Sequence, residues 1–172
     1  DTDVTVKAGS TFANDNAFDV KTFTVEATAT FNFGDGMKTV LTRDGVTVSG
    51  DFTNAGTVRV VGGSVPLVTG HYVQTTSGTY RTDAQPLSKL YVSSATLPSH
   101  AKIDVVTGND CAGISIGQWR SVLHATTFAS DGTFAVTDDC TAMDFVGSVG
   151  GPDLYITAVA PNAAPTAGSV LL

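Results

Sequence analysis

The stretch with the most catalytic spacing is Gly113-Ile114-Ser115-Ile116-Gly117, which matches the G-x-S-x-G nucleophile elbow. That motif exposes its serine at a joint between a strand and a helix, and an acid followed by a histidine completes the site. Here the flanking residues favour β-structure, and His124 precedes most of the candidate acids. We interpret Ser115 and His124 as strand residues and expect no enzymatic activity, so alanine at either position should leave any measurable activity unchanged.

Metal chemistry is also poorly supported by the residue spacing. His71, His100 and His124 lie far apart, and none belongs to a short ligand motif such as H-x-x-x-H. Aspartates are frequent in the turns and could hold calcium, but the chain has neither an EF-hand loop nor a G-G-x-G-x-D repeat. We therefore predict no catalytic, metal-binding or cofactor-binding residue.

The two cysteines, Cys111 and Cys140, are the third candidate for chemistry. A pair about thirty residues apart in an extracellular-looking β protein favours a disulfide, since a metal site needs more ligands at short spacing. We predict a structural disulfide between them.

The composition points to an all-β protein and excludes several classes of function. Thr, Val and Gly are abundant, and Glu26 is the single glutamate, so strand and turn formers dominate over helix formers. The net charge of -7 and the absence of a Lys/Arg run argue against nucleic acid and anionic membranes as partners. No apolar stretch is long enough to span a bilayer. The start at Asp1, without Met or a signal-like segment, indicates a processed chain or a piece of a longer one.

A repeat in the first half of the sequence predicts the strands that would position these residues. Residues 4–12 align with 23–31, and residues 50–59 align with 70–81, with apolar residues opposite apolar ones. The marker aromatics recur at a period of roughly twenty residues, as in stacked coils. We predict that they form one ladder along neighbouring coils: Phe12, Phe31, Phe52 and Tyr72. The predicted fold is a right-handed parallel β-helix, or β-solenoid.

Three regions follow from where this repeat is clear. We predict solenoid coils over residues 1–82, a β-rich C-terminal cap over 83–160, and a linker or tail over 161–172. The expected cap strands are 87–92, 101–106, 114–123, 132–136 and 154–159. A solenoid end exposes unpaired backbone, so terminal units must depart from the repeat.

The order of several short motifs resembles autotransporter passenger domains. Residues 70–75, 78–82 and 87–97 are similar to the "G-x-Y-x-Q-T … G-T-L-R … L-x-V-x-G-x-A-x-L" passage of that family, and residues 132–145 with 154–157 are similar to its "F-x-V-x-D-x-S-x-L-F-D-F … V-D-L-x-V" ending. The resemblance covers about residues 45–159 and implies a right-handed β-helix closed by a C-terminal folding cap. The cysteine pair and the missing membrane barrel depart from the family pattern.

The expected function is therefore mechanical: a non-enzymatic stalk and folding cap of a secreted protein or of one on the bacterial cell surface. One alternative is a filament subunit, in which the solenoid end docks on other protein chains or on copies of itself. The other is a glycan-binding or glycan-cleaving module on the side of the solenoid. A cleaving site would need two carboxylates about 5 to 10 Å apart, and outward acids do not repeat between coils.

Overall fold

The computed structural model describes residues 2–14, 18–33, 45–61, 63, 65–108 and 111–161, and these residues form β-strands joined by turns, with no α-helix. The strands belong to two sheets. The larger has ten strands: β1 (Asp3–Val6), β3 (Phe18–Val20), β4 (Thr22–Val25), β6 (Gly45–Val48), β7 (Asp51–Asn54), β9 (Leu67–Gln74), β11 (Leu90–Thr96), β13 (Trp119–Ala129), β15 (Asp144–Gly150) and β16 (Asp153–Val159). The smaller has six: β2 (Thr11–Asn14), β5 (Thr30–Phe33), β8 (Thr57–Val60), β10 (Thr79–Asp83), β12 (Ala101–Val106) and β14 (Phe134–Asp138).

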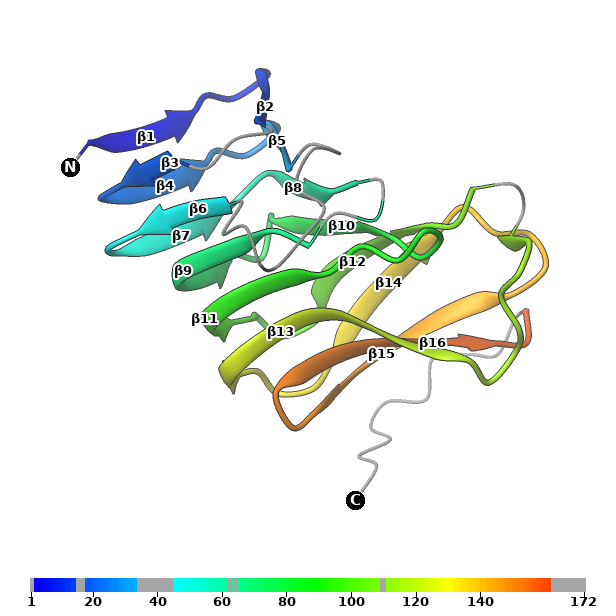
Figure 1. The fold of residues 1–172 in the computed structure, drawn as a ribbon. Helices are drawn as coiled ribbons and strands as arrows, with labels where there is room; N and C mark the ends of the chain where they lie inside the picture. The colour runs from blue at the N-terminus through cyan, green and yellow to red at the C-terminus, as the bar shows by residue number, and fades with distance from the viewer. Residues whose placement is uncertain are drawn as a thin grey trace.

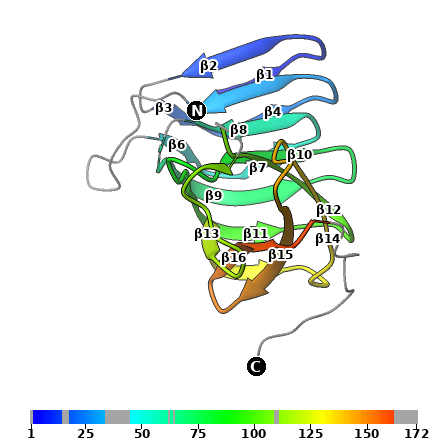
Figure 2. The ribbon, with the colours of Figure 1, turned by 90° about the vertical axis from the view of Figure 1, so that its right-hand side faces the viewer.

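The chain passes back and forth between the two sheets, and from β4 to β14 each new strand pairs in parallel with a strand from an earlier pass. The strands consequently form rungs stacked from β1 and β2 at one end to β13 and β14 near the other (Figures 1 and 2). The long strand β9 pairs with both β6 and β7, which occupy one level of the larger sheet. Parallel pairing over many rungs places equivalent residues of successive passes directly beside one another.

Alternation of side chains makes the space between the sheets largely apolar. In β8, Val58 and Val60 are buried and Thr57 and Arg59 are half-buried; in β10, Tyr80 is buried together with the polar Thr82. The fully buried large side chains come from both sheets and include Phe23, Phe31, Phe52, Tyr72 and Tyr80. Burying each such side chain contributes about 1.5 to 3 kcal/mol, so the stacked interior is the main source of stability.

The predicted aromatic ladder is wrong in its grouping. Phe12 pairs with Phe31 in the six-stranded sheet, whereas Phe52 pairs with Tyr72 in the ten-stranded sheet. The position beside Phe31 is taken by Val58, and the position beside Phe52 on its other side is taken by Phe23. Each pairwise alignment of the repeat is correct. The two alignments describe different strands of the coil, but both contain an aromatic residue and therefore look equivalent in the sequence.

Parallel pairing extends well beyond residue 82, where the sequence repeat fades. β10 pairs in parallel with β12, β12 with β14, and β11 with β13. The pattern changes at β16, which pairs antiparallel with β13 and with β15. The antiparallel β15–β16 hairpin thus covers the C-terminal end of the stack, at the end opposite β1 in Figure 1.

Close packing of the hairpin on the smaller sheet depends on Gly147 in β15. A Cβ at this position would lie 2.9 Å from the Cβ and Cγ of Phe134 in β14. A glycine inside a strand commonly marks such a close approach. This contact joins the hairpin to the last strand of the six-stranded sheet.

Most of the expected cap strands are present, with shifted bounds. The range 101–106 matches β12, and 154–159 matches β16 to within one residue. The range 114–123 began too early, because Ser115 lies in an exposed turn that precedes Trp119, the first residue of β13. Strand β15 was not predicted. The expected tail, 161–172, lies outside the described residues apart from Pro161.

Candidate functional site

Ser115 and His124, the two residues weighed for the G-x-S-x-G match, have separate hydrogen-bond partners. Ser115 lies in the turn before β13, where its backbone N–H donates to Gln118 Oε1 at 3.2 Å. His124 lies within β13, as expected, and its Nδ1 is 3.1 Å from Asp153 Oδ1. No α-helix follows Ser115 in the described part of the chain, so the strand-to-helix joint that a nucleophile elbow requires is missing there.

A polar cluster instead forms around Asp153, the first residue of β16. We call it the Asp153 cluster, and its members come from three segments distant in sequence: Lys89, Ser121, His124, Asp153 and Tyr155. Lys89 Nζ lies 2.9 Å and Ser121 Oγ 2.7 Å from Asp153 Oδ1, and the Tyr155 hydroxyl donates to Oδ2 at 3.3 Å. With His124 included, four donors converge on one carboxylate.

Aromatic rings flank this cluster on both sides. The Tyr91 ring of β11 lies 5.2 Å from the His124 ring, and Lys89 Nζ lies 4.9 Å from the Tyr91 centroid. On the other side, the Tyr155 ring meets Trp119 edge-on, with centroids 5.3 Å apart. The Trp119 side chain is 64% exposed. Rings and polar groups therefore form a continuous row across β11, β13 and β16, which we call the aromatic strip: Tyr91, Lys89, His124, Asp153, Tyr155 and Trp119.

A bulge in β13 makes this row possible. Residues three apart in a regular strand face opposite sides, which would separate Ser121 from His124. The register of β13 against β16 shifts between Ser121 and Leu123, and both Val122 and Leu123 are fully buried. Ser121 and His124 consequently reach the same carboxylate. Bulges of this kind re-aim side chains and are frequent at functional sites.

The surrounding donors keep the Asp153 carboxylate ionised. Burial would raise the pKa of Asp153, but hydrogen bonds from Lys89, Ser121 and His124 and the Lys89 charge lower it to about 2. Because an ionised carboxylate can only accept, Nδ1 of His124 carries the hydrogen and donates it. A neutral His124 then presents the Nε2 lone pair as an acceptor.

We expect Asp153→Asn to remove an acid-sensitive part of the stability. The pKa of Asp153 in the folded protein lies below the ordinary aspartate value of 3.8. The carboxylate therefore stabilises the fold above about pH 4, and this contribution is lost as the pH falls toward 2. The variant should be about 2 kcal/mol less stable than wild type at pH 7, with the difference shrinking toward pH 2.

Urea unfolding at pH 7, 4 and 2 measures this dependence. Tyr155→Phe is the matched control, because it removes one donor and keeps the carboxylate. Its deficit should be smaller, and its stability should keep the acid-dependent loss. An Asp153→Asn deficit that is constant with pH would contradict the assignment.

The three histidines occupy separate environments. His71 lies beside Asp51 in register, as the repeat predicted, with Nδ1 2.6 Å from Ser94 Oγ and Nε2 3.0 Å from Thr96 Oγ1. The backbone N–H of His100 donates to Thr133 Oγ1. Among the described residues, no three His, Cys, Asp or Glu side chains come together as a group that could hold a metal ion.

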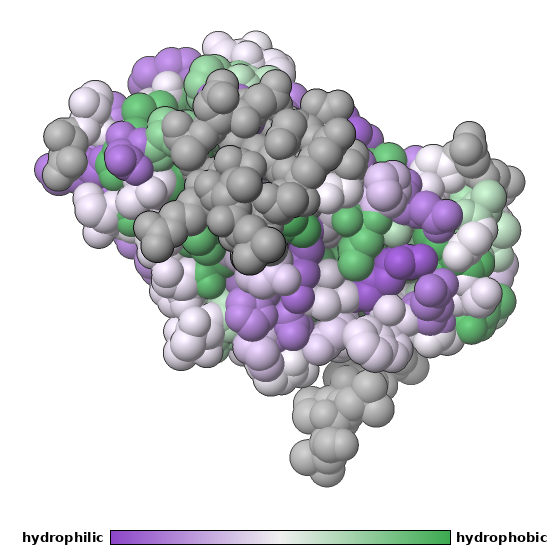
Figure 3. Space-filling model, in the orientation of Figure 1, coloured by the Kyte–Doolittle hydropathy of each residue, from purple (hydrophilic) through white to green (hydrophobic). Residues whose placement is uncertain are grey.

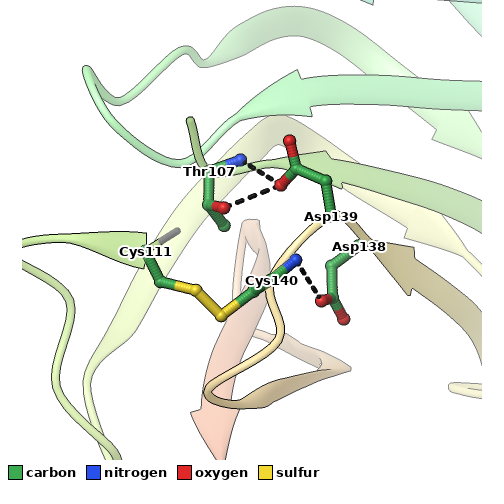
Figure 4. The surroundings of a disulfide bond; sticks show 5 residues. All are labelled: Thr107, Cys111, Asp138, Asp139 and Cys140. Atoms are coloured by element: carbon green, nitrogen blue, oxygen red, sulfur yellow. Dashed lines mark hydrogen bonds between the residues drawn. A yellow bond between two sulfur atoms is a disulfide. The ribbon is translucent and has the colours of Figure 1, made fainter. Parts of the chain in front are cut away.

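Cys111 and Cys140 form the predicted disulfide, with Cα atoms 5.7 Å apart (Figure 4). It ties the turn after β12 to the turn after β14. Next to it, the backbone N–H and hydroxyl of Thr107 both donate to Asp139 Oδ1 at 2.7 Å. Burial opposes ionisation of Asp139, but these hydrogen bonds outweigh it and lower its pKa. The turn after β14 is thus held by a covalent bond and by a charged acceptor.

The double variant Cys111→Ser/Cys140→Ser should lose about 3 to 4 kcal/mol, the loop-closure value for a bridge spanning 29 residues. Denaturant unfolding of the variant and of oxidised wild type measures the loss. In a separate check, the native thiols should react with an alkylating reagent after reduction and not before it. Equal stabilities of the two proteins would contradict a structural role.

Comparisons with protein-family models, with curated proteins and with solved structures found no match to this chain. Function is therefore argued from the geometry. Sequence reasoning missed the Asp153 cluster, since its members are separated by up to 66 positions and none belongs to a catalytic or ligand-binding motif. A usable signal was the run Ser121-Val122-Leu123-His124, in which two adjacent apolar residues interrupt the alternation and indicate a bulge.

Proposed function

We propose that the chain is a right-handed parallel β-helix and serves as a non-enzymatic structural module, a stalk with a C-terminal folding cap, of a secreted or cell-surface protein. The observation that carries this proposal is the difference between the two ends of the stack. The β15–β16 hairpin covers the C-terminal end, whereas β1 and β2 each pair on one side with a later strand, β4 and β5. A stack with one covered end is suited to terminate a longer column of coils.

The surface around β1 and β2 supports a continuation of the stack at that end. Phe12 in β2 stacks on Phe31 with ring centroids 5.7 Å apart, yet 42% of Phe12 stays exposed. Val4 is also only partly buried. A preceding coil would cover these side chains and pair with β1, which is the outermost strand of the larger sheet in the described part of the chain. The resemblance to autotransporter passengers agrees with this arrangement.

One further observation agrees with an extracellular position. The disulfide is of a kind that persists in oxidising compartments. Within the described residues, no helix has the length and apolar character needed to cross a membrane.

End-to-end assembly is the second candidate, favoured by the same exposed Phe12 and outermost strand β1. Its partner would be another protein chain or a second copy. The antiparallel hairpin at the opposite end does not repeat the parallel edge that β1 presents. A repeating head-to-tail filament is therefore less well supported than contact through the N-terminal end alone.

Electron microscopy together with sedimentation of the purified chain tests the proposal. A stalk module should give elongated particles of uniform length whose sedimentation does not change with concentration. Open filaments would replace the proposal with the assembly alternative. Compact, near-spherical particles would contradict both.

A further inference from the structure

The aromatic strip combines two features that single exposed aromatics lack. Isolated apolar residues on a surface are normal and carry no functional meaning. Trp119, however, has a second ring beside it, and Tyr155 also donates a hydrogen bond to Asp153. The polar centre is held by four donors on one carboxylate. The arrangement is thus already organised before any ligand arrives.

The aromatic strip is not a broad apolar contact area, because its polar members lie between the rings at its two ends. On the face of the molecule shown in Figure 3, strongly hydrophilic and apolar side chains also lie next to one another over short distances. A ligand that fits must itself offer apolar faces and hydroxyl groups in close succession.

We propose that the aromatic strip binds a neutral carbohydrate chain. The exposed Trp119 ring stacks on a sugar ring, the edge-on Tyr155 ring borders it, and His124 and Asp153 engage hydroxyl groups. The C–H faces of a pyranose are apolar and pack on aromatic rings, while its hydroxyls both donate and accept. At the centre of the row, the Asp153 carboxylate is an acceptor, and Nε2 of His124 accepts from a hydroxyl when the ring is neutral and donates to one when the ring is protonated.

The charges of the strip and of the whole protein favour a neutral carbohydrate over an anionic one. Lys89 forms an ion pair with Asp153 at 2.9 Å, so these two charges cancel within the strip. The whole chain carries a net charge of -7, which disfavours polyanions at long range. Cleavage is not part of the proposal, because Asp153 is the one carboxylate of the strip and glycoside hydrolysis uses a pair.

The proposal goes beyond the structural role and is independent of it. A stalk without this site would still give the particles expected above. If no carbohydrate binds, the stalk proposal is unaffected. If the particles are not elongated, the binding measurement can still be interpreted.

Trp119 provides a direct probe, because it is the single tryptophan of the chain. The purified protein is titrated with cellohexaose, chitohexaose and maltohexaose while its tryptophan emission is recorded. At least one oligosaccharide should shift the emission to shorter wavelength in a saturable way, with a Kd of about 1 mM or tighter. No saturable change with any of the three would overturn the proposal.

Calorimetry on variants then assigns the contacts. Trp119→Ala and His124→Ala should each weaken binding by about tenfold or more. Phe12→Ala is the matched control, since it removes an exposed ring from the far end of the molecule and should bind as wild type does. Circular dichroism verifies that each variant is folded. If Trp119→Ala does not fold, Trp119→Phe replaces it in the binding measurement. Equal affinity in Trp119→Ala and wild type would also overturn the proposal.

Discussion

Replacing Phe52 by alanine should lower the free energy of unfolding by about 3 to 5 kcal/mol, the range for removing a buried phenylalanine. Phe52 is fully buried and stacks on Phe23 with ring centroids 4.7 Å apart. It also approaches Phe31 of the opposite sheet at 6.0 Å and Tyr72 of the next rung at 5.8 Å. Alanine would leave a cavity shared by two sheets and three rungs, which rigid parallel strands cannot close.

Phe12→Ala is the control for this prediction, because Phe12 has the same residue type and a similar stacking partner but lies in an end rung. It should cost less than about 1 kcal/mol, as for other exposed positions. Urea unfolding of both variants at neutral pH, monitored by circular dichroism, gives the two values. If the costs are equal, the interior of the stack does not hold the protein together as described.

The same two residues show how much of the fold was accessible from the sequence. Composition and the alternation of apolar residues predicted an all-β chain, and the pairwise repeat predicted the register of β1 with β4 and of β7 with β9. The sequence could not tell which strand of a coil each aromatic marks. Phe12 and Phe52 occupy different sheets although each follows a glycine, Gly9 or Gly50, by two or three residues. Sheet membership depends on where the chain turns, and turn residues are too common here to locate it.

The candidate site was less accessible because it depends on non-local pairing. Asp153 meets His124 through antiparallel pairing of β16 with β13, and Lys89 reaches it from the segment before β11. The hairpin itself was missed in part, since β15 contains Gly147 and ends in the glycines that predicted a turn. Gly147 weakens the strand signal in the sequence. The same residue is needed in the structure, because its lack of a Cβ lets β15 pack against Phe134.

Deleting residues 140–172 should unfold the protein or make it aggregate. The deletion removes the β15–β16 hairpin and five buried apolar side chains: Met143, Phe145, Leu154, Ile156 and Ala158. The larger of these contribute about 1.5 to 3 kcal/mol each when buried. Their sum is comparable to the whole stability of an ordinary domain, about 5 to 15 kcal/mol. It also uncovers Leu123 of β13, which pairs with Leu154 and is fully buried.

Deleting residues 1–17 should have a much smaller effect, because it removes β1 and β2 and leaves β4 and β5 as new end strands of the same kind. Within the described residues, Val6 is the single apolar side chain of the deleted segment that is buried. The energy of stacked units is approximately a sum over units and their interfaces, so loss of one end unit is tolerated.

Circular dichroism melts and sedimentation of the two truncations measure the difference. The C-terminal truncation is made with Cys111→Ser, so that no unpaired thiol confuses the result, and is compared with the Cys111→Ser/Cys140→Ser full-length chain. A cooperative melt is expected for the N-terminal truncation and for that full-length control, and none for the C-terminal truncation. If the C-terminal truncation melts cooperatively and the N-terminal one collapses, the end that stabilises this stack is the one at β1 and β2, and the hairpin is not its cap.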